Sequence, residues 1–130
     1  MINLSEAEVK NACEEHLGWQ QNLGKLWWSR LNAGDIYIPN KDGSMRKFKG
    51  AGAGTSDLIV VQPGQIHLEY MGEQHGPGAP VNFVTFVECK STKGKQSPEQ
   101  IEFQAKVEAL HCRYAIVRSV DELVTVLARE

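Results

Sequence analysis

The sequence has 130 residues, of which 42% are hydrophobic and 23% charged, and its formal net charge is -2 at pH 7. These values fit a single globular domain with a buried core, and the longest apolar runs are too short for a transmembrane helix. The mildly acidic charge argues against a protein that coats nucleic acid along its whole surface, although local basic patches can still bind phosphates. We therefore expect one domain over residues 1–130, with no membrane partner.

The number and spacing of the cysteines indicate the cellular compartment. Cys13, Cys89 and Cys112 are widely spaced and form no CxxC pair. Their odd number and their spacing argue against a disulfide framework and against structural zinc, and the four histidines share no ligand-like spacing. Small buried thiols in a reducing environment are the simplest interpretation. Because no signal-peptide pattern opens the sequence, we expect a cytoplasmic protein.

The first predicted element is a helix. Ser5 and Glu8 form a capping box, apolar residues follow at helical spacing as far as Leu17, and Gly18 is the expected stop. Glu6 continues the apolar stripe, so its carboxylate needs a partner, because burying an unpaired charge is costly. The other glutamates are expected on the solvated side of this helix: Glu8, Glu14 and Glu15.

Short strands are predicted next, over residues 26–31 and 36–38. Trp27 and Trp28 are neighbours in the first strand, so they should face opposite sides of the sheet, with one of them filling the core. The other is expected to cover a dimer surface or to stack on a base. Residues 39–54 are rich in glycine, lysine and arginine, which indicates a long basic loop or an irregular hairpin.

The longer apolar segments are expected to form the centre of a sheet. Residues 57–61 predict a buried strand, Pro63-Gly64 predicts a turn, and residues 65–71 predict a second strand. Three glycines and two prolines indicate a surface loop over residues 72–80, and residues 81–90 form the next strand.

The C-terminal part contains two further helices and one strand. Ser97-Pro98 is a favoured helix start, and this helix is expected to end near Leu110. Residues 114–118 predict the last strand, and a capping box over residues 119–122 begins the closing helix. The predicted fold class is α/β, with a mixed central sheet, made of a three-strand meander plus a further strand, flanked by helices.

Candidate catalytic residues lie at two strand ends. One strand begins at Asp57, and another ends in Glu88-Cys89-Lys90. Because side chains alternate along a strand, Glu88 and Lys90 share one face while Cys89 points to the other. Apolar residues on both faces of this strand argue against a solvated Glu88. Two carboxylates beside an ammonium group can hold a divalent metal next to a cation, which suits phosphodiester hydrolysis. The simpler alternative for Asp57 is a turn residue that caps the glycine-rich loop before it.

The expected metal is Mg2+, which prefers hard oxygen ligands and keeps several waters, so two or three carboxylates suffice. The expected ligands are Asp57, Glu88 and the backbone carbonyl of Cys89. Glu6 joins them, directly or through water, if the first helix packs over the sheet. Lys90 is expected to orient or activate the attacking water and to offset the phosphate charge.

Three segments together resemble the VRR-NUC branch of the PD-(D/E)xK nuclease superfamily: Gly54-Thr55-Ser56-Asp57, Glu88-Cys89-Lys90 and Ser97-Pro98-Glu99-Gln100. The stretch Arg30-Leu31-Asn32-x-Gly34 and the final strand, Ala115 to Ser119, are also similar to that family. The resemblance extends from the first helix to Glu122. Two features depart from the usual pattern: Ser56 stands where proline is common, and residues 65–80 are longer than a tight hairpin.

The resemblance implies a restriction-endonuclease-like core and a role for five residues. Asp57 and Glu88 match the metal ligands, Lys90 the catalytic lysine, Glu6 the first-helix glutamate, and Gln100 a helix glutamine beside the active site. Short members of this kind look like homodimeric, Mg2+- or Mn2+-dependent DNA endonucleases, some of which cut branched or flapped structures, with no organic cofactor. Such stand-alone domains are frequent in bacteriophage genomes, which would place the protein in the host-cell cytoplasm.

Several alternatives stay open. Gln100 also completes a capping box with Ser97, and this role is compatible with a place in the site. The expected DNA contacts are basic residues whose alternative is a solvated charge: Arg30, Arg46, Lys47, Lys49, Lys93 and Lys95. The alternative function is a non-catalytic nucleic-acid-binding protein of the same fold, and a purely structural interaction domain is a third possibility. RNA is an alternative substrate, since phosphate chemistry does not distinguish the sugars.

Overall fold

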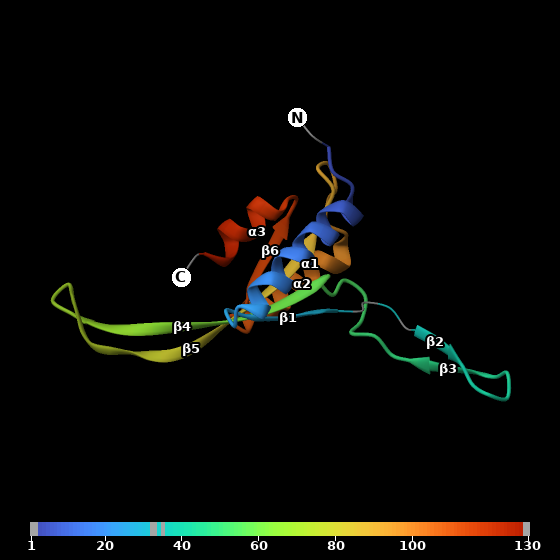
Figure 1. The fold of residues 1–130 in the computed structure, drawn as a ribbon, viewed down its shortest axis with the longest axis horizontal. Coiled ribbons are helices and arrows are strands. Elements are labelled where there is room, and N and C mark those ends of the chain that lie inside the picture. Colours follow the sequence, from blue (N-terminus) through green and yellow to red (C-terminus); the bar gives the residue numbers. More distant parts are fainter. Residues whose placement is uncertain (1–2, 32–33, 35, 129–130) are drawn as a thin grey trace.

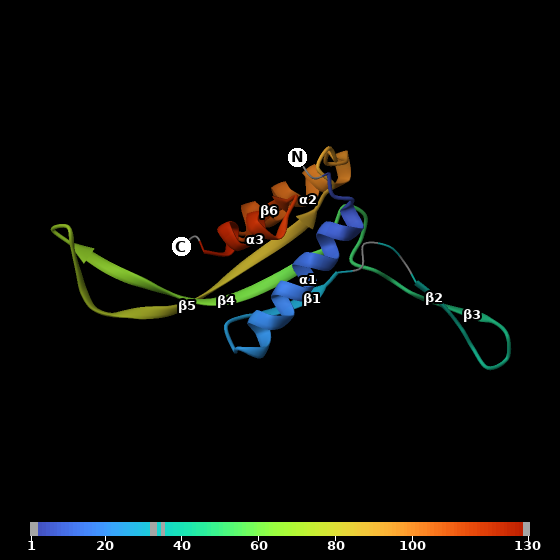
Figure 2. The ribbon, with the colours of Figure 1, turned by 45° about the horizontal axis from the view of Figure 1, so that its top comes forward.

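A computed structural model describes residues 3–31, 34 and 36–128 (Figures 1 and 2). Asn32, which belongs to one of the segments that resemble the family, lies outside the described residues. The described elements are α1 (Glu6–Asn22), β1 (Trp27–Arg30), β2 (Ile36–Pro39), β3 (Met45–Phe48), β4 (Leu58–Tyr70), β5 (Glu73–Cys89), α2 (Pro98–Ala109), β6 (Arg113–Val117) and α3 (Val120–Leu127). Within these residues, no helix combines the length and apolar character needed to cross a membrane.

The central sheet has four strands in the order β1-β4-β5-β6. β1, β4 and β5 pair antiparallel, whereas β6 runs parallel to β5, with Cys89 opposite Val117. The parallel pair is possible because α2 supplies the crossover between β5 and β6. The predicted α/β class, with a three-strand meander plus a further strand, is therefore confirmed, and it is consistent with a restriction-endonuclease-like fold.

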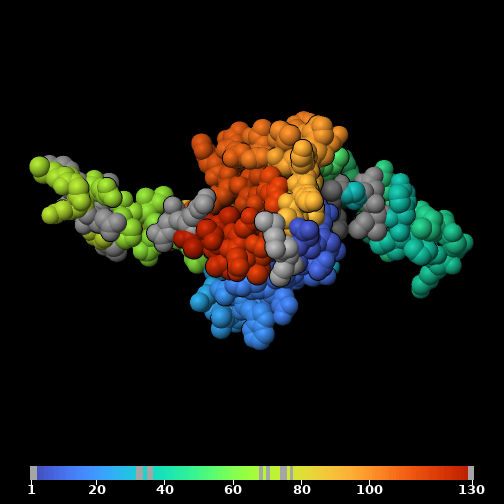
Figure 3. All heavy atoms as spheres, turned by 90° about the horizontal axis from the view of Figure 1, so that it is seen from above, coloured from blue at the N-terminus to red at the C-terminus, as the bar shows by residue number. Residues whose placement is uncertain are grey.

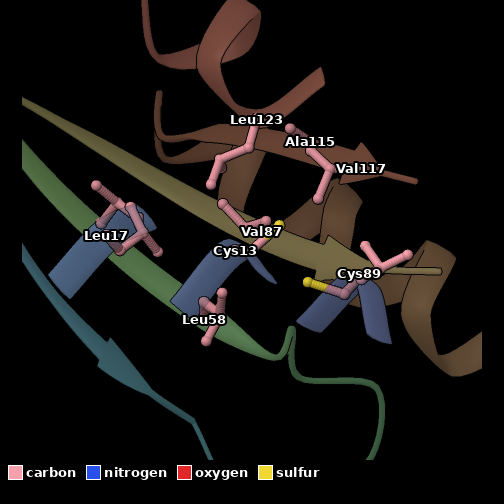
Figure 4. Packing of buried hydrophobic residues seen from close by; sticks show 10 residues of the cluster. Cys13, Leu17, Leu58, Val87, Cys89, Ala115, Val117 and Leu123 are labelled. Carbon is pink, nitrogen blue, oxygen red and sulfur yellow. The ribbon is translucent and has the colours of Figure 1, made fainter. Parts of the chain in front are cut away.

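Helices cover both faces of this sheet. Alternate strand residues, such as Leu58 and Val87, meet α1 and α3 in a buried cluster (Figure 4). The opposite face receives α2, where the Phe103 ring packs edge-on against Phe86 at 5.3 Å between ring centroids. Glu88 follows Phe86 by two residues, so it belongs to the α2 face. Trp28 packs on the core while Trp27 is exposed, which agrees with their predicted opposite orientation.

The first helix is longer than predicted. The Ser5–Glu8 capping box is present, but α1 continues through Gly18 to Asn22, so the predicted stop is wrong. Glycine in a helix interior lowers stability without preventing the helix when packing supports it. Glu14 is also not solvated as predicted: it is buried, because its carboxylate forms a bidentate pair with the Arg30 guanidinium.

The β4–β5 hairpin is much longer than predicted. Pro63-Gly64 is not a turn but lies within β4, and residues 72–80 are not a loop, since β5 begins at Glu73. The real turn is Met71-Gly72, whose φ values of 53° and 80° suit a two-residue hairpin turn. Gly64 is required inside the strand, because a Cβ there would lie 1.9 Å from the Phe83 ring.

The basic segment forms a hairpin, which settles the alternative left open by the sequence. β2 and β3 pair only with each other, in a two-stranded sheet separate from the central one. This hairpin and the outer part of the β4–β5 hairpin project from opposite sides of the body as two arms (Figures 1 and 3). The body between the arms contains the candidate catalytic residues.

Candidate active site

Asp57 is placed by the short loop that precedes β4. Gly54 has a φ of 83°, and a Cβ at this position would lie 2.2 Å from the backbone oxygen of Glu99 in the first turn of α2. Glycine thus lets the loop touch α2. Ser56, which stands where proline is common in the family, is buried and donates its hydroxyl to the backbone oxygen of Leu58 at 3.1 Å.

The Asp57 carboxylate has two different environments. Its Oδ2 accepts a hydrogen bond from the Cys89 backbone N–H at 2.8 Å, which ties the start of β4 to the end of β5. Its Oδ1 lies 3.7 Å from the Lys10 ammonium of α1. Asp57 is therefore held by another strand, and the alternative role of a residue that only caps the preceding loop is not what the hydrogen bonds show.

Glu88 is buried and only partly satisfied. Its Oε1 accepts from Gln100 Nε2 at 2.9 Å and lies 3.7 Å from Lys90 Nζ. Its Oε2 is buried and, among the described residues, has no hydrogen-bond partner. Burial, and then the negative charge of Asp57, raise the pKa of Glu88 to about 8, although the nearby Lys90 ammonium lowers it in part.

Gln100 combines both of the roles expected for it. Its Oε1 accepts from the Ser97 backbone N–H at 2.9 Å, and its own backbone N–H donates to Ser97 Oγ at 3.2 Å, which completes a capping box. Its Nε2 is left to donate to Glu88. The cap therefore fixes the side chain that holds the buried carboxyl, so helix geometry orients a residue on the neighbouring strand.

Lys90 links the sheet to α1. Its ammonium lies 3.8 Å from Glu6 Oε1 and 3.7 Å from Glu88 Oε1, while its side chain is only 11% exposed. Contact with Glu88 agrees with the predicted shared face. Glu6 has a partner in Lys90, but its side chain is 55% exposed, so the prediction that it continues the buried apolar stripe is wrong and it lies at the rim of the site.

Lys10 was not anticipated from the sequence. It follows Glu6 by four residues, so both side chains project from one face of α1, and each contacts a different strand residue of the site. The available signal was this spacing from Glu6. No motif marks the position, which explains why sequence reasoning missed it.

The residues present fit a small divalent cation. Asp57, just before β4, and Glu88, near the end of β5, offer carboxylate oxygens side by side, and the buried Glu88 Oε2 accepts no hydrogen bond from the described N–H groups, so a cation could satisfy it. In the described part of the chain, no three His, Cys, Asp or Glu side chains converge in a metal-binding cluster. Glu6 therefore does not complete a three-carboxylate set, and its contact is with Lys90. Two carboxylates suit Mg2+, which retains much of its water shell.

The expected DNA-contacting residues fall into separate groups. Arg46, Lys47 and Lys49 lie on or just after β3, in the β2–β3 arm. Lys93 and Lys95 are exposed in the loop between β5 and α2. Arg30 lies at the end of β1, where Glu14 holds its guanidinium.

The cysteines have structural positions. Cys13 and Cys89 are fully buried in the core, and Cys112 is partly exposed (Figure 4). All three are free thiols, and the prediction of a buried thiol is confirmed for Cys13 and Cys89 but is wrong for Cys112. The Cys89 backbone contributes to the site, while its side chain contributes to the core.

Comparison with known proteins identifies the family to which the sequence belongs. Searches of curated proteins and of solved structures gave no match. The family model of the VRR-NUC domain matches residues 6–121, a range that includes every residue of the site from Glu6 to Gln100. The family implies a nuclease-type activity. The chain therefore belongs to the VRR-NUC family.

Proposed function

We propose that this protein is a Mg2+-dependent endonuclease that hydrolyses DNA phosphodiester bonds, with Mn2+ able to replace Mg2+. The observation that carries the proposal is that Asp57, which the Cys89 backbone N–H holds at the end of β5, stands beside the buried Glu88 carboxyl and the Lys90 ammonium. This arrangement also supports placing the family within the PD-(D/E)xK superfamily. The proposed ligands are Asp57, Glu88 and the backbone carbonyl of Cys89.

Each residue around the proposed metal site has a distinct role. Lys90 donates a hydrogen bond that orients the attacking water and offsets charge on the phosphate. Glu6, at the rim of the site, keeps the Lys90 side chain in place. Gln100 fixes the rotamer of Glu88. When bound, the metal supplies charge neutralisation at the phosphate and a lowered pKa for its water.

The test is a panel of fluorescent DNA substrates, comprising duplex, flap, fork and four-way junction, incubated with Mg2+, Mn2+ or EDTA. We expect cleavage that requires the metal, is absent in Asp57→Ala, and is fastest on a branched substrate or appears as nicking of one strand. An RNA version of each substrate tests whether the protein cleaves DNA, RNA or both. Metal-dependent cleavage by pure Asp57→Ala at the wild-type rate would refute the assignment.

The alternative function is nucleic-acid binding without catalysis. Calorimetric titration with Mn2+ distinguishes the two, because a catalytic site should bind Mn2+ in the wild type and lose that binding in Glu88→Gln. Glu102→Gln is the matched control, since Glu102 lies on the exposed surface of α2. Wild-type protein that binds DNA but takes up no Mn2+ would support the alternative.

The proposed assembly is a homodimer. One active site cuts one strand, so paired incision of a branched substrate needs two sites related by symmetry. A nuclease domain of this kind fits a bacteriophage gene product acting in the host cytoplasm. Sedimentation equilibrium tests the dimer, and a monomer at working concentration that still makes paired cuts would contradict it.

A further inference from the structure

The β2–β3 arm, comprising residues 36–49, is chemically unlike the rest of the chain. It contains four lysine or arginine residues and one aspartate, in a protein whose formal net charge is -2. Asp42 Oδ1 accepts hydrogen bonds within the turn from the Ser44 hydroxyl at 2.5 Å and from the Ser44 backbone N–H at 2.9 Å, and these lower the pKa of Asp42. The arm is therefore a concentrated positive surface.

Aromatic groups accompany the cations on both faces of the arm. Cross-strand pairing places Tyr37 opposite Lys47 on one face. On the other face, the Arg46 guanidinium lies 5.3 Å from the centre of the Phe48 ring. The Tyr37 side chain is 60% exposed and Phe48 is 50% exposed. Because every residue of β3 is exposed, these groups are not needed for the core.

The opposite arm provides an internal comparison. Residues 62–83, in the outer part of the β4–β5 hairpin, contain two glutamates and no lysine or arginine. The two arms leave opposite sides of the body, and the β2–β3 arm leaves on the side where β4 begins (Figure 1). Only the segment from Gly50 to Ser56 separates the end of this arm from Asp57 in the chain.

At the root of the arm, Lys49 continues the positive surface toward the body, while the Arg30 guanidinium in the same pocket is paired with Glu14. This pocket is lined by Ile38 and Phe48 of the arm, by Arg30 of β1, and by Lys49. Phosphates that follow this surface would pass from the arm to the start of β4. Charge complementarity thus favours a polyanion, and a protruding two-stranded ribbon has the width that the major groove of B-form DNA admits.

We propose that the β2–β3 arm is a DNA-binding ribbon that lies in the major groove of the duplex on one side of the cleaved bond. This inference rests on the proposed function for its nucleic-acid substrate. Four-residue strands extend about 14 Å, so the ribbon would cover about four base pairs of flanking duplex. The arm would set the length and form of DNA required on that side, while the β4–β5 arm would make no phosphate contact.

The test compares two double variants with equal net charge. Lys41→Gln/Lys49→Gln removes charge from the arm outside its two strands, so the strand pairing and the Arg46–Phe48 contact are kept. Lys25→Gln/Lys106→Gln removes the same charge from exposed positions on the body. Binding is measured by fluorescence anisotropy in EDTA, across a range of salt, with DNA whose two duplex flanks are shortened in turn.

We expect the arm variant to bind about tenfold more weakly at low salt, with a salt slope smaller by about 2 than that of the wild type. The body variant should bind within about twofold of the wild type. Shortening one flank below about four base pairs should weaken the wild type and leave the arm variant almost unaffected. Circular dichroism shows whether both variants are folded.

Three results would overturn the inference: an unchanged salt slope in the arm variant, an equal loss of binding in the body variant, or the same arm dependence with single-stranded or duplex RNA flanks. Duplex RNA is decisive, because its deep, narrow major groove excludes a ribbon. Cleavage by the wild type in Mg2+ is assayed in parallel. Cleavage without arm-dependent binding refutes only the DNA-binding role of the β2–β3 arm. Arm-dependent binding without cleavage refutes only the proposed nuclease function.

Discussion

Burial of the Glu88 carboxyl raises its pKa and thereby links the stability of the protein to pH. In the metal-free protein its pKa is raised to about 8, so between pH 4.5 and 8 the folded state keeps a proton that the unfolded chain has released. The folded state thus binds more protons over this range, and the free energy of unfolding must fall as the pH rises from 4.5 to 8. As a metal ligand, Glu88 must lose this proton when a cation binds, so metal binding should release a proton and tighten as the pH rises toward 8.

Glu88→Gln should remove this pH dependence. We expect the variant to exceed the wild type in free energy of unfolding by roughly 2–4 kcal/mol at about pH 9, and to equal it at about pH 4, where both side chains are neutral. Urea denaturation in EDTA measures both values. Equal stability of the two proteins at the higher pH would show that Glu88 is not held protonated.

Lys10 is the second residue with a specific expectation. Its ammonium lies 3.7 Å from Asp57 Oδ1, the carboxylate oxygen that the Cys89 backbone leaves available. A divalent cation at Asp57 must therefore compete with Lys10. We expect Lys10→Met to bind Mn2+ about fivefold more tightly than the wild type, as judged by calorimetry.

Lys25→Met is the control for Lys10, because Lys25 is an exposed lysine just after α1. It should leave Mn2+ affinity unchanged. If Lys10→Met weakened Mn2+ binding instead, the ammonium would be supporting the carboxylate rather than competing for it.

At the scale of elements, the site depends on the contact between the loop before β4 and the first turn of α2. Gly54→Ala would place a Cβ 2.2 Å from the Glu99 backbone oxygen, at a φ of 83°. Gly52 has a φ of 103°, but a Cβ there would have no neighbouring atom within 4 Å, so Gly52→Ala carries only the backbone strain.

The two glycine variants should therefore differ. We expect Gly52→Ala to lose about 1–2 kcal/mol of unfolding free energy, and Gly54→Ala to lose about 2–3 kcal/mol more, together with Mn2+ binding. Equal losses, measured by urea denaturation and calorimetry, would show that the approach to α2 does not position Asp57.

The sequence predicted most elements because their local signals agreed with the tertiary structure. The capping boxes at Ser5 and Ser97 begin α1 and α2 where expected, and alternation along β5 placed Glu88 beside Lys90. The errors arose where packing outweighed local preference. Gly64 indicated a turn, but it is glycine because the Phe83 ring covers it within a strand.

Residues of the site were predictable to the extent that a motif marked them. Asp57, Glu88, Lys90 and Gln100 have contacts that match their predicted neighbours. Lys10 and the burial of Glu14 depend on how α1 lies across β1 and β4, and no local pattern encodes that packing.

The whole molecule has a small body and two arms of opposite chemical character (Figure 1). The net charge of -2 hides this asymmetry, because four lysine or arginine residues lie in the β2–β3 arm and none lies in the outer part of the β4–β5 hairpin. A substrate with negative charge would therefore approach from one side of the body. Such a substrate would extend from the basic β2–β3 arm, past the start of β4, to the carboxylates of Asp57 and Glu88.

Whether the site around Glu88 and Lys90 cleaves DNA is tested by the rate of Mg2+-dependent cleavage by Lys90→Ala, compared with that of Lys93→Ala. Both variants remove one lysine from the same short segment, but only Lys90 contacts Glu6 and Glu88. The account predicts a loss of at least about 100-fold for Lys90→Ala, with both variants folded, and at most a severalfold loss for Lys93→Ala. Wild-type cleavage rates in pure, folded Lys90→Ala would contradict it.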